Sequence, residues 1–139
     1  MIPGDDKHRQ IYDALVDVLG EDYVSDAPAV MQAYHRDYTC WGSKARRPPE
    51  FVVLPGCTED VTRFVGLANR YRFPYVPVSG AMLMQDTVAV KPYWCIVDLK
   101  RMNRIDVDVK NMHAVVEPYA SHAQVQAEAM KHGLFVGTP

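Results

Sequence analysis

Residues 51–61 read Phe-Val-Val-Leu-Pro-Gly-Cys-Thr-Glu-Asp-Val, and residues 75–78 read Tyr-Val-Pro-Val. The continuous apolar run that opens the first stretch is typical of a buried strand. Thr58 is expected to cap a following helix, because the two acidic residues after it suit the positive end of a helix dipole. With a second strand expected at 75–78, these residues predict a βαβ unit with parallel strands and a right-handed crossover.

Two helices are expected on the amino-terminal side of this unit. Apolar residues recur at helical spacing over residues 6–19, and Gly20 suits the position just past the end of a helix. Ser25-Asp26 offers an N-cap for a second, short helix with Pro28 in its first turn. The helical pattern is then lost, so residues 1–48 are interpreted as a helical lead-in to the main domain.

The carboxyl-terminal side predicts a third apolar strand, a hairpin and a helix. The strand is expected at residues 95–97, and alternating apolar residues predict a hairpin between 105–109 and 114–116. Ser121 is expected to cap a last helix, which Gly133 closes. A βαβ unit followed by a hairpin and a helix, after a helical lead-in, is an α+β fold.

Length and composition restrict the classes of function. The 139 residues are within the usual size of one domain, and 48% apolar residues are enough for a core. A formal net charge of −2 argues against nucleic acid or an anionic membrane as the partner. The basic residues at 44–47 are interpreted as part of a solvated loop. No apolar run approaches the ~20 residues of a membrane-spanning helix.

Motifs for metal binding and for common catalytic chemistry are not found. Cys40, Cys57 and Cys95 are odd in number and lack C-x-x-C spacing, which argues against a disulfide framework or a zinc site and favours the reducing cytoplasm. No G-x-S-x-G, Walker or G-x-G-x-x-G motif occurs. No residue is assigned as catalytic or as a metal ligand, and structural roles are favoured for His8, His35, His113, His122 and His132.

The loop after the strand at 75–78 is the candidate ligand site. Open sheets place ligands beyond the carboxyl ends of their strands, and the loop begins with Ser79-Gly80-Ala81. Small residues let the backbone approach a ligand, and successive N–H groups can hold an anion such as a pyrophosphate. Composition alone favours an ordinary surface loop, so both interpretations stay open at this point.

Four landmarks carry a resemblance to a known family, and they occur in this order: Pro49-Glu50-Phe51-Val52-Val53-Leu54-Pro55 before Thr58-Glu59-Asp60-Val61; Ala68-Asn69-Arg70-Tyr71 before Val76-Pro77; Val97-Asp98-Leu99-Lys100-Arg101-Met102-Asn103-Arg104-Ile105; and Val115-Val116-Glu117-Pro118 before His132-Gly133-Leu134. The region 49–139 thereby resembles the N-terminal part of the FAD-binding domain of the vanillyl-alcohol oxidase and p-cresol methylhydroxylase superfamily. It is most similar to the glycolate oxidase and D-lactate dehydrogenase branch.

The resemblance implies FAD as the cofactor, bound without a covalent link. In the family, the loop after the second strand wraps the pyrophosphate with backbone amides. Carried over, that role falls on Pro77, Val78, Ser79, Gly80, Ala81, Met82 and Leu83. The family usually has several glycines and a threonine in this loop, and a glycine where Tyr119 stands, so the chain departs from its relatives at these positions.

The family's second FAD segment and substrate-binding cap domain would follow the residues present here. The first hypothesis is therefore a component of an oxidoreductase that acts on a small 2-hydroxy acid or alcohol. Another polypeptide would supply the rest of the flavin domain and the cap, or the chain would form a homo-oligomer. The second hypothesis is a degenerate, non-catalytic interaction subunit that has lost flavin, and the third is a truncated product of a longer gene.

Overall fold

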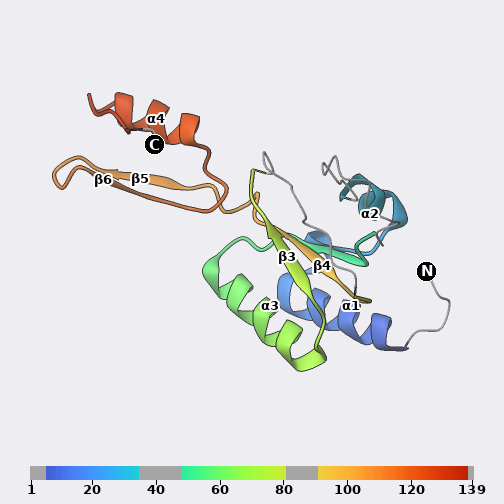
Figure 1. Cartoon of the computed structure of the whole chain (residues 1–139). Helices are drawn as coiled ribbons and strands as arrows, with labels where there is room; N and C mark the ends of the chain where they lie inside the picture. Colours follow the sequence, from blue (N-terminus) through green and yellow to red (C-terminus); the bar gives the residue numbers. More distant parts are fainter. Residues whose placement is uncertain (1–5, 35–47, 81–90, 138–139) are drawn as a thin grey trace.

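The computed structural model describes residues 6–34, 48–80 and 91–137. In chain order the elements are α1 (Asp6–Leu19), η1 (Glu21–Tyr23), β1 (Val24–Ser25), α2 (Pro28–Tyr34), β2 (Phe51–Val53), α3 (Thr58–Tyr71), β3 (Tyr75–Val78), β4 (Cys95–Asp98), β5 (Ile105–Asp108), β6 (His113–Val116) and α4 (His122–Met130). Figure 1 shows two groups: β1–β4 with α1–α3, here called the sheet unit, and β5, β6 and α4, here called the hairpin module. This arrangement confirms the predicted α+β class.

Strand β4 lies at the centre of the sheet unit. The strand order is β1-β2-β4-β3, where β2 and β3 both run parallel to β4 and β1 runs antiparallel to β2. The predicted strand, helix and strand of the βαβ unit are therefore present and the strands are parallel, but β4 separates them. All four residues of β4 are buried, because it has a neighbour on each edge and a packed layer on each face.

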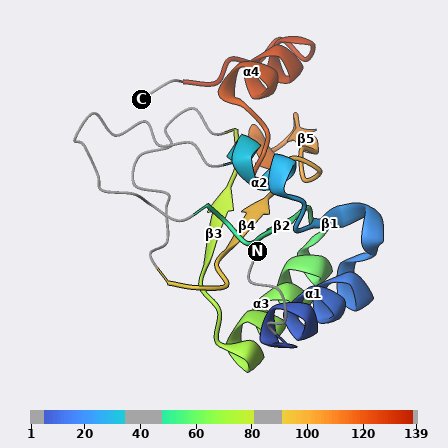
Figure 2. The same cartoon turned by 90° about the vertical axis from the view of Figure 1, so that its right-hand side faces the viewer.

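The two faces of the sheet carry separate cores. The larger core lies between the sheet and helices α1 and α3, and it consists of Ile11, Leu15, Val24, Phe51, Val53, Phe64, Ala68, Phe73, Cys95 and Val97. On the opposite face, α2 packs Met31 against Val52, Val78, Trp94 and Ile96. Figure 2 shows α1 and α3 together, with α2 across the sheet from them. Each such side chain stabilises the fold by about 1.5–3 kcal/mol.

The amino-terminal helices form as predicted and join the same core as the sheet. Helix α1 ends at Leu19, and Gly20 follows with a φ of 91°, a conformation that glycine adopts readily. Ser25 Oγ accepts a hydrogen bond from Ala27 N just before α2, at 3.2 Å. Strand β1 pairs with β2, and α1 packs against α3. The division of the chain at residue 48 stays a prediction, and the described part of the lead-in packs directly on the sheet.

The prediction that Thr58 caps α3 is wrong. The N-cap residue is Cys57, whose side chain makes no capping bond, and Thr58 is the first helical residue. The carboxylate of Asp60 reaches back instead, and its Oδ2 accepts a hydrogen bond from Gly56 N at 2.9 Å. A carboxylate in the first turn satisfies a backbone N–H and suits the helix dipole, so a threonine cap is not needed.

The hairpin module follows the predicted order. Strands β5 and β6 pair antiparallel, with Ile105 opposite Val116, and the connection between them holds Met112 at a φ of 55°. Ser121 caps α4 as predicted, in a capping box with Gln124. Gly133 has a φ of 72° and ends the helix, as expected. Figure 1 shows the module projecting away from the sheet unit.

Some sequence predictions lie outside the described residues. They include the basic loop at 44–47 and Cys40. Cys57 and Cys95 are free thiols. Within the described ranges, every helix is too short or too polar to cross a membrane.

Candidate cofactor site

The carboxyl ends of β3 and β4 meet at one edge of the sheet. Val78 is in register with Asp98, and its carbonyl accepts a hydrogen bond from Leu99 N at 2.9 Å. This bond continues the parallel pairing one residue beyond β4, and so fixes the point at which the chain leaves β3. The first two residues after β3, Ser79 and Gly80, are exposed at this edge. Open parallel sheets bind ligands at this end of their strands.

The structure describes Pro77 to Gly80 of the predicted cofactor residues, and the remaining three lie outside its described part. Pro77 is exposed within β3, and Val78 is buried. Ala81, Met82 and Leu83 lie outside the described residues. The candidate cofactor residues that have a described position are therefore the four from 77 to 80.

The backbone at Ser79 and Gly80 is open. Among the described residues, neither backbone N–H is hydrogen-bonded. A Cβ placed on Gly80 meets no described atom within 4 Å. Two successive unpaired N–H groups can hold an anion, and the absent side chain leaves room for a ligand to approach. Within the described residues, the backbone here therefore leaves room for an anionic group.

A polar cluster that sequence reasoning did not assign lies beside this edge. Asp98 is the one charged residue that is buried among the described residues, with 7% of its surface exposed. Tyr34 OH donates a hydrogen bond to Asp98 Oδ2 at 2.5 Å, and Lys100 N donates to Asp98 Oδ1 at 2.9 Å. Lys100 Nζ lies 3.6 Å from Asp98 Oδ2. The carboxylate is therefore well compensated, as a buried charge has to be.

The cluster holds Tyr34 as a neutral hydrogen-bond donor. Burial, followed by the hydrogen bond to Asp98 and the charge of Asp98, raises the pKa of Tyr34 well above its ordinary value of 10.0. Tyr34 ends α2, and Asp98 ends β4. The hydrogen bond therefore ties α2 to the strand that borders the candidate loop. Its role is to hold this end of the sheet in position and not to transfer a proton. The signal that could have identified Asp98 is that a charged residue directly follows the apolar run predicted as a strand at residues 95–97.

Arg101 organises the neighbouring end of β2. Its Nη1 donates a hydrogen bond to Leu54 O at 2.8 Å, and its guanidinium lies 3.5 Å from the centre of the Tyr23 ring. A Cβ on Gly56 would lie 2.7 Å from Arg101 Nη2, so glycine leaves room for the arginine. The loop after β4 is thereby fastened to the loop after β2. No three His, Cys, Asp or Glu side chains gather within the described ranges in a way that could hold a metal ion.

Comparison with known proteins gives matches in both sequence and structure. Residues 49–139 match a family model described as an FAD binding domain. The mitochondrial D-lactate dehydrogenase [cytochrome] of Arabidopsis thaliana is 33% identical over 94 residues, which are 66% of this chain and 16% of that protein. The glycolate oxidase subunit GlcD of Bacillus subtilis is 26% identical over 129 residues, covering 91% of this chain and 27% of that subunit.

Solved structures show the same fold. A 4-ethylphenol oxidase from Gulosibacter chungangensis matches with a TM-score of 0.81 and 25% identity over 93% of this chain and 25% of that one. A p-cresol methylhydroxylase matches with a TM-score of 0.79 and 22% identity over 94% of this chain and 26% of that one. The resemblance inferred from the sequence is thereby confirmed, and FAD is supported as the cofactor. The chain spans only about a quarter or less of the length of most of these proteins.

Proposed function

The chain belongs to the FAD-binding domain family, and from this premise we propose that it is the FAD-binding component of a flavin-dependent oxidoreductase. Its substrate is a small 2-hydroxy acid or a comparable alcohol. Two relatives, a D-lactate dehydrogenase and a glycolate oxidase subunit, are named for 2-hydroxy acids. When bound, FAD supplies the hydride-accepting chemistry, and the protein supplies binding and orientation.

The chain's own contribution is to hold the pyrophosphate at the edge formed by β3 and β4. The observation that carries this proposal is that, within the described ranges, the N–H groups of Ser79 and Gly80 have no hydrogen-bond partner and the space at Gly80 is open. Pro77 and Val78 fix the start of the loop, because Val78 is paired with β4 on its inner side. FAD is held without a covalent link, and Ala81, Met82 and Leu83 continue the same loop contact.

Another polypeptide supplies the rest of the flavin domain and the substrate-binding part. The region that this chain matches is 16% of the plant D-lactate dehydrogenase and 27% of GlcD. A homo-oligomer is the alternative assembly. The free thiols of Cys57 and Cys95 agree with a reducing compartment, and we place the protein in the cytoplasm.

One observation favours a second candidate function, a non-catalytic interaction subunit that has lost flavin. Met82 and Leu83 stand in the loop at positions where the family that this chain resembles usually has glycines. Bulky side chains restrict how closely a loop can wrap a ligand. The two functions differ in one measurable property, which is whether the assembled protein contains FAD.

The test uses the full chain, tagged and purified gently from its own cells. Native mass spectrometry is expected to detect a second polypeptide and the mass of FAD in one complex. A complex that lacks flavin would support the interaction subunit. A chain found alone, with neither flavin nor a second polypeptide, would contradict both functions.

A substitution then tests the loop itself. Gly80→Val is expected to lower FAD affinity at least about tenfold, because the branched side chain fills the space over the two N–H groups. Gly66→Val is the matched control, since Gly66 is exposed on α3 and a Cβ there also meets no described atom within 4 Å. Equal flavin content in the two variants would contradict the assignment of the loop.

A further inference from the structure

A lysine stands at the carboxyl end of β4, beside the open backbone of the candidate loop. Asp98 is the last residue of β4 and is in register with Val78, the last residue of β3. Lys100 follows Asp98 by two positions, and 45% of its side chain is exposed. A positive charge therefore lies at the edge of the sheet where the loop after β3 begins.

The ammonium group of Lys100 lies on the α2 side of the sheet. Its Nζ is 3.4 Å from Tyr34 OH, at the end of α2, and 3.6 Å from Asp98 Oδ2. Val78 belongs to the apolar cluster on this same side, and Tyr34 packs against that cluster. Because Asp98 and Val78 are paired neighbours, and neighbouring strands are about 4.8 Å apart, the ammonium group is close to the start of the loop.

The buried carboxylate of Asp98 is satisfied without this ammonium group. Its Oδ2 accepts a hydrogen bond from Tyr34 OH at 2.5 Å, and its Oδ1 accepts one from Lys100 N at 2.9 Å. The 3.6 Å between Lys100 Nζ and Asp98 Oδ2 is too long for a hydrogen bond. The contact with Tyr34 OH uses at most one of the three donors of the ammonium group. Lys100 therefore keeps donors for another acceptor.

The neighbouring cation, Arg101, is engaged elsewhere. Its guanidinium lies over the Tyr23 ring, and its Nη1 donates a hydrogen bond to Leu54 O, so it serves the end of β2. Among the described residues, Lys100 is therefore the one of these two adjacent cations whose charged group is not committed to a neighbouring loop.

The backbone of the candidate loop offers the other half of an anion site. Within the described ranges, the N–H groups of Ser79 and Gly80 have no hydrogen-bond partner, and a Cβ on Gly80 meets no atom within 4 Å. Successive N–H groups can hold an anion, but each carries only a partial charge. A lysine ammonium group adds a full charge, and phosphate oxygens are common acceptors for it.

We propose that Lys100 is a further binding residue of this edge, and that its ammonium group contacts the anion held by the N–H groups of Ser79 and Gly80. Asp98 and Tyr34 keep the ammonium group on the α2 side without taking up all of its hydrogen bonds. The inference rests on the proposed function, under which this anion is the pyrophosphate of FAD.

Lys100→Met tests the charge, and Lys100→Arg tests whether another cation restores it. The full chain is purified gently from its own cells, and the dissociation constant of FAD is measured from flavin fluorescence. Lys100→Met is expected to weaken FAD binding at least about tenfold, which is the usual effect of losing a hydrogen bond to a charged group. Lys100→Arg keeps the charge and is expected to recover most of the affinity. Unchanged affinity in Lys100→Met overturns the assignment.

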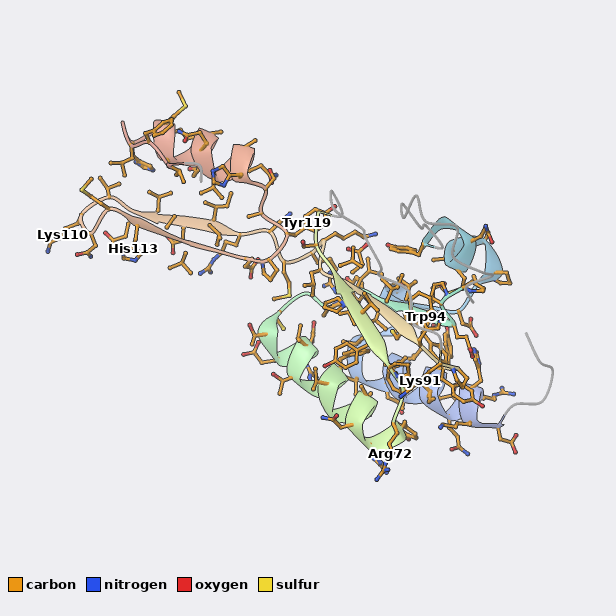
Figure 3. The ribbon with its side chains drawn as sticks, viewed as in Figure 1. Arg72, Lys91, Trp94, Lys110, His113 and Tyr119 are labelled. Carbon is orange, nitrogen blue, oxygen red and sulfur yellow. The ribbon has the colours of Figure 1, made fainter. Side chains whose placement is uncertain are left out.

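Lys110→Met is the matched control, because it removes the same charge from another exposed lysine. Figure 3 shows Lys110 at the tip of the hairpin module, whereas Tyr119 lies at the base of the module, near the carboxyl ends of β3 and β4. Lys110→Met is expected to bind FAD as the wild type does. Equal losses of affinity in Lys110→Met and Lys100→Met would show that only net charge matters, which overturns the assignment.

Ionic strength separates a binding contact from a structural role of Lys100. The screening length falls from about 10 Å at 0.1 M salt to about 3 Å at 1 M salt. The difference in FAD affinity between the wild type and Lys100→Met is therefore expected to shrink as salt is added. A difference of the same size at both salt concentrations would show that Lys100 supports the fold around Asp98, and it overturns the binding role.

A titration of the wild type with inorganic pyrophosphate decides the question if Lys100→Met does not fold. Nuclear magnetic resonance follows the side chain of Lys100 and the amides of Ser79 and Gly80. Shifts at all three residues support the proposed contact. Shifts at Ser79 and Gly80 alone overturn the role of Lys100 and leave the loop assignment standing, and no shift at any of the three overturns the anion site.

The outcomes separate this inference from the proposed function. A protein that holds FAD equally well with and without the charge of Lys100 overturns the inference and leaves the proposed function standing. A wild-type protein that holds no FAD contradicts the proposed function. In that case, shifts of Lys100 with pyrophosphate still support an anion contact at this edge, and their absence overturns it.

Discussion

The sheet unit and the hairpin module contain similar strands in opposite environments. Strand β4 reads Cys-Ile-Val-Asp and all four of its residues are buried, whereas β6 reads His-Ala-Val-Val and all four of its residues are exposed. Both strands hold an apolar run of comparable length. The difference is that β4 has strands on both edges and packed clusters on both faces, whereas β6, within the described residues, pairs with β5 alone.

This difference concentrates stability in the sheet unit. The two buried clusters of side chains both belong to the sheet unit, and neither includes a residue of β5, β6 or α4. Regions with few buried apolar contacts open locally at low free energy. The hairpin module is therefore expected to exchange its amides and respond to denaturant before the sheet unit does.

Replacing an aromatic residue in the core of the sheet unit is expected to give the largest loss of stability. Phe64 is 0% exposed, and its ring packs edge-on against Phe73 and Tyr75. Phe64→Ala is expected to lower the free energy of unfolding by about 3–5 kcal/mol, because it leaves a cavity in the larger core. Urea unfolding followed by circular dichroism measures this change. Val115→Ala is the control and should change the free energy by less than about 0.5 kcal/mol; similar losses in both variants would contradict the contrast.

The buried carboxylate should give the next largest effect. Tyr34→Phe removes the hydroxyl that donates to Asp98 Oδ2. The free energy of unfolding is expected to fall by about 1–3 kcal/mol, because a buried acceptor loses its partner. Tyr75→Phe is the control, since the ring of Tyr75 packs on Phe64 and is retained. Thermal unfolding of the two variants compares them, and an unchanged Tyr34→Phe protein would show that solvent or Lys100 replaces the bond.

Loss of the α4 cap should act on the hairpin module alone. Ser121 Oγ accepts a hydrogen bond from Gln124 N at 3.3 Å, and Ser121 N donates to Gln124 Oε1 at 2.8 Å. Ser121→Ala is expected to cost about 1 kcal/mol locally and to accelerate amide exchange throughout α4. Exchange in β4 should stay at the wild-type rate. Faster exchange in β4 as well would indicate that the two regions unfold as one unit. Ser121→Thr keeps the capping oxygen and serves as the control.

The smallest effect is expected at the start of α3, and it depends on pH. The hydrogen bond from Gly56 N, with help from Cys57 and Arg63, lowers the pKa of Asp60 from its ordinary value of 3.8. A depressed pKa contributes stability that is present above the unfolded value and is lost as pH falls through the folded value. Asp60→Asn is therefore expected to cost about 0.5–1 kcal/mol at pH 7 and progressively less as the pH falls below 3.8.

Unfolding measured from pH 7 down to pH 2 tests this sign. The exposed neighbour Glu59 provides the control substitution Glu59→Gln, which leaves the bond to Gly56 intact. A difference between Asp60→Asn and the wild type that stays constant as the pH falls from 7 to 2 would show that the carboxylate charge is not the cause.

Local sequence patterns predicted most of the secondary structure. The helix at residues 6–19, the strand at 75–78 and the Ser121 cap are found where periodicity, proline and capping chemistry placed them. The helix at Thr58 was also predicted, but its cap was predicted wrongly, because the helix begins at Thr58 itself and Asp60 accepts the bond from Gly56 N. The start of the candidate loop at Ser79 and Gly80 likewise follows from a strand that ends there.

Only the tertiary structure decided which strands are neighbours and which apolar residues are covered. It placed β4 between β2 and β3, brought Tyr34 to Asp98 across 64 positions of the chain, and left β6 at an open edge. Periodicity records the preference of each residue for water or for a core. Burial depends on contacts between distant segments, which local spacing does not contain, and so two similar apolar runs became a buried strand, β4, and an exposed strand, β6.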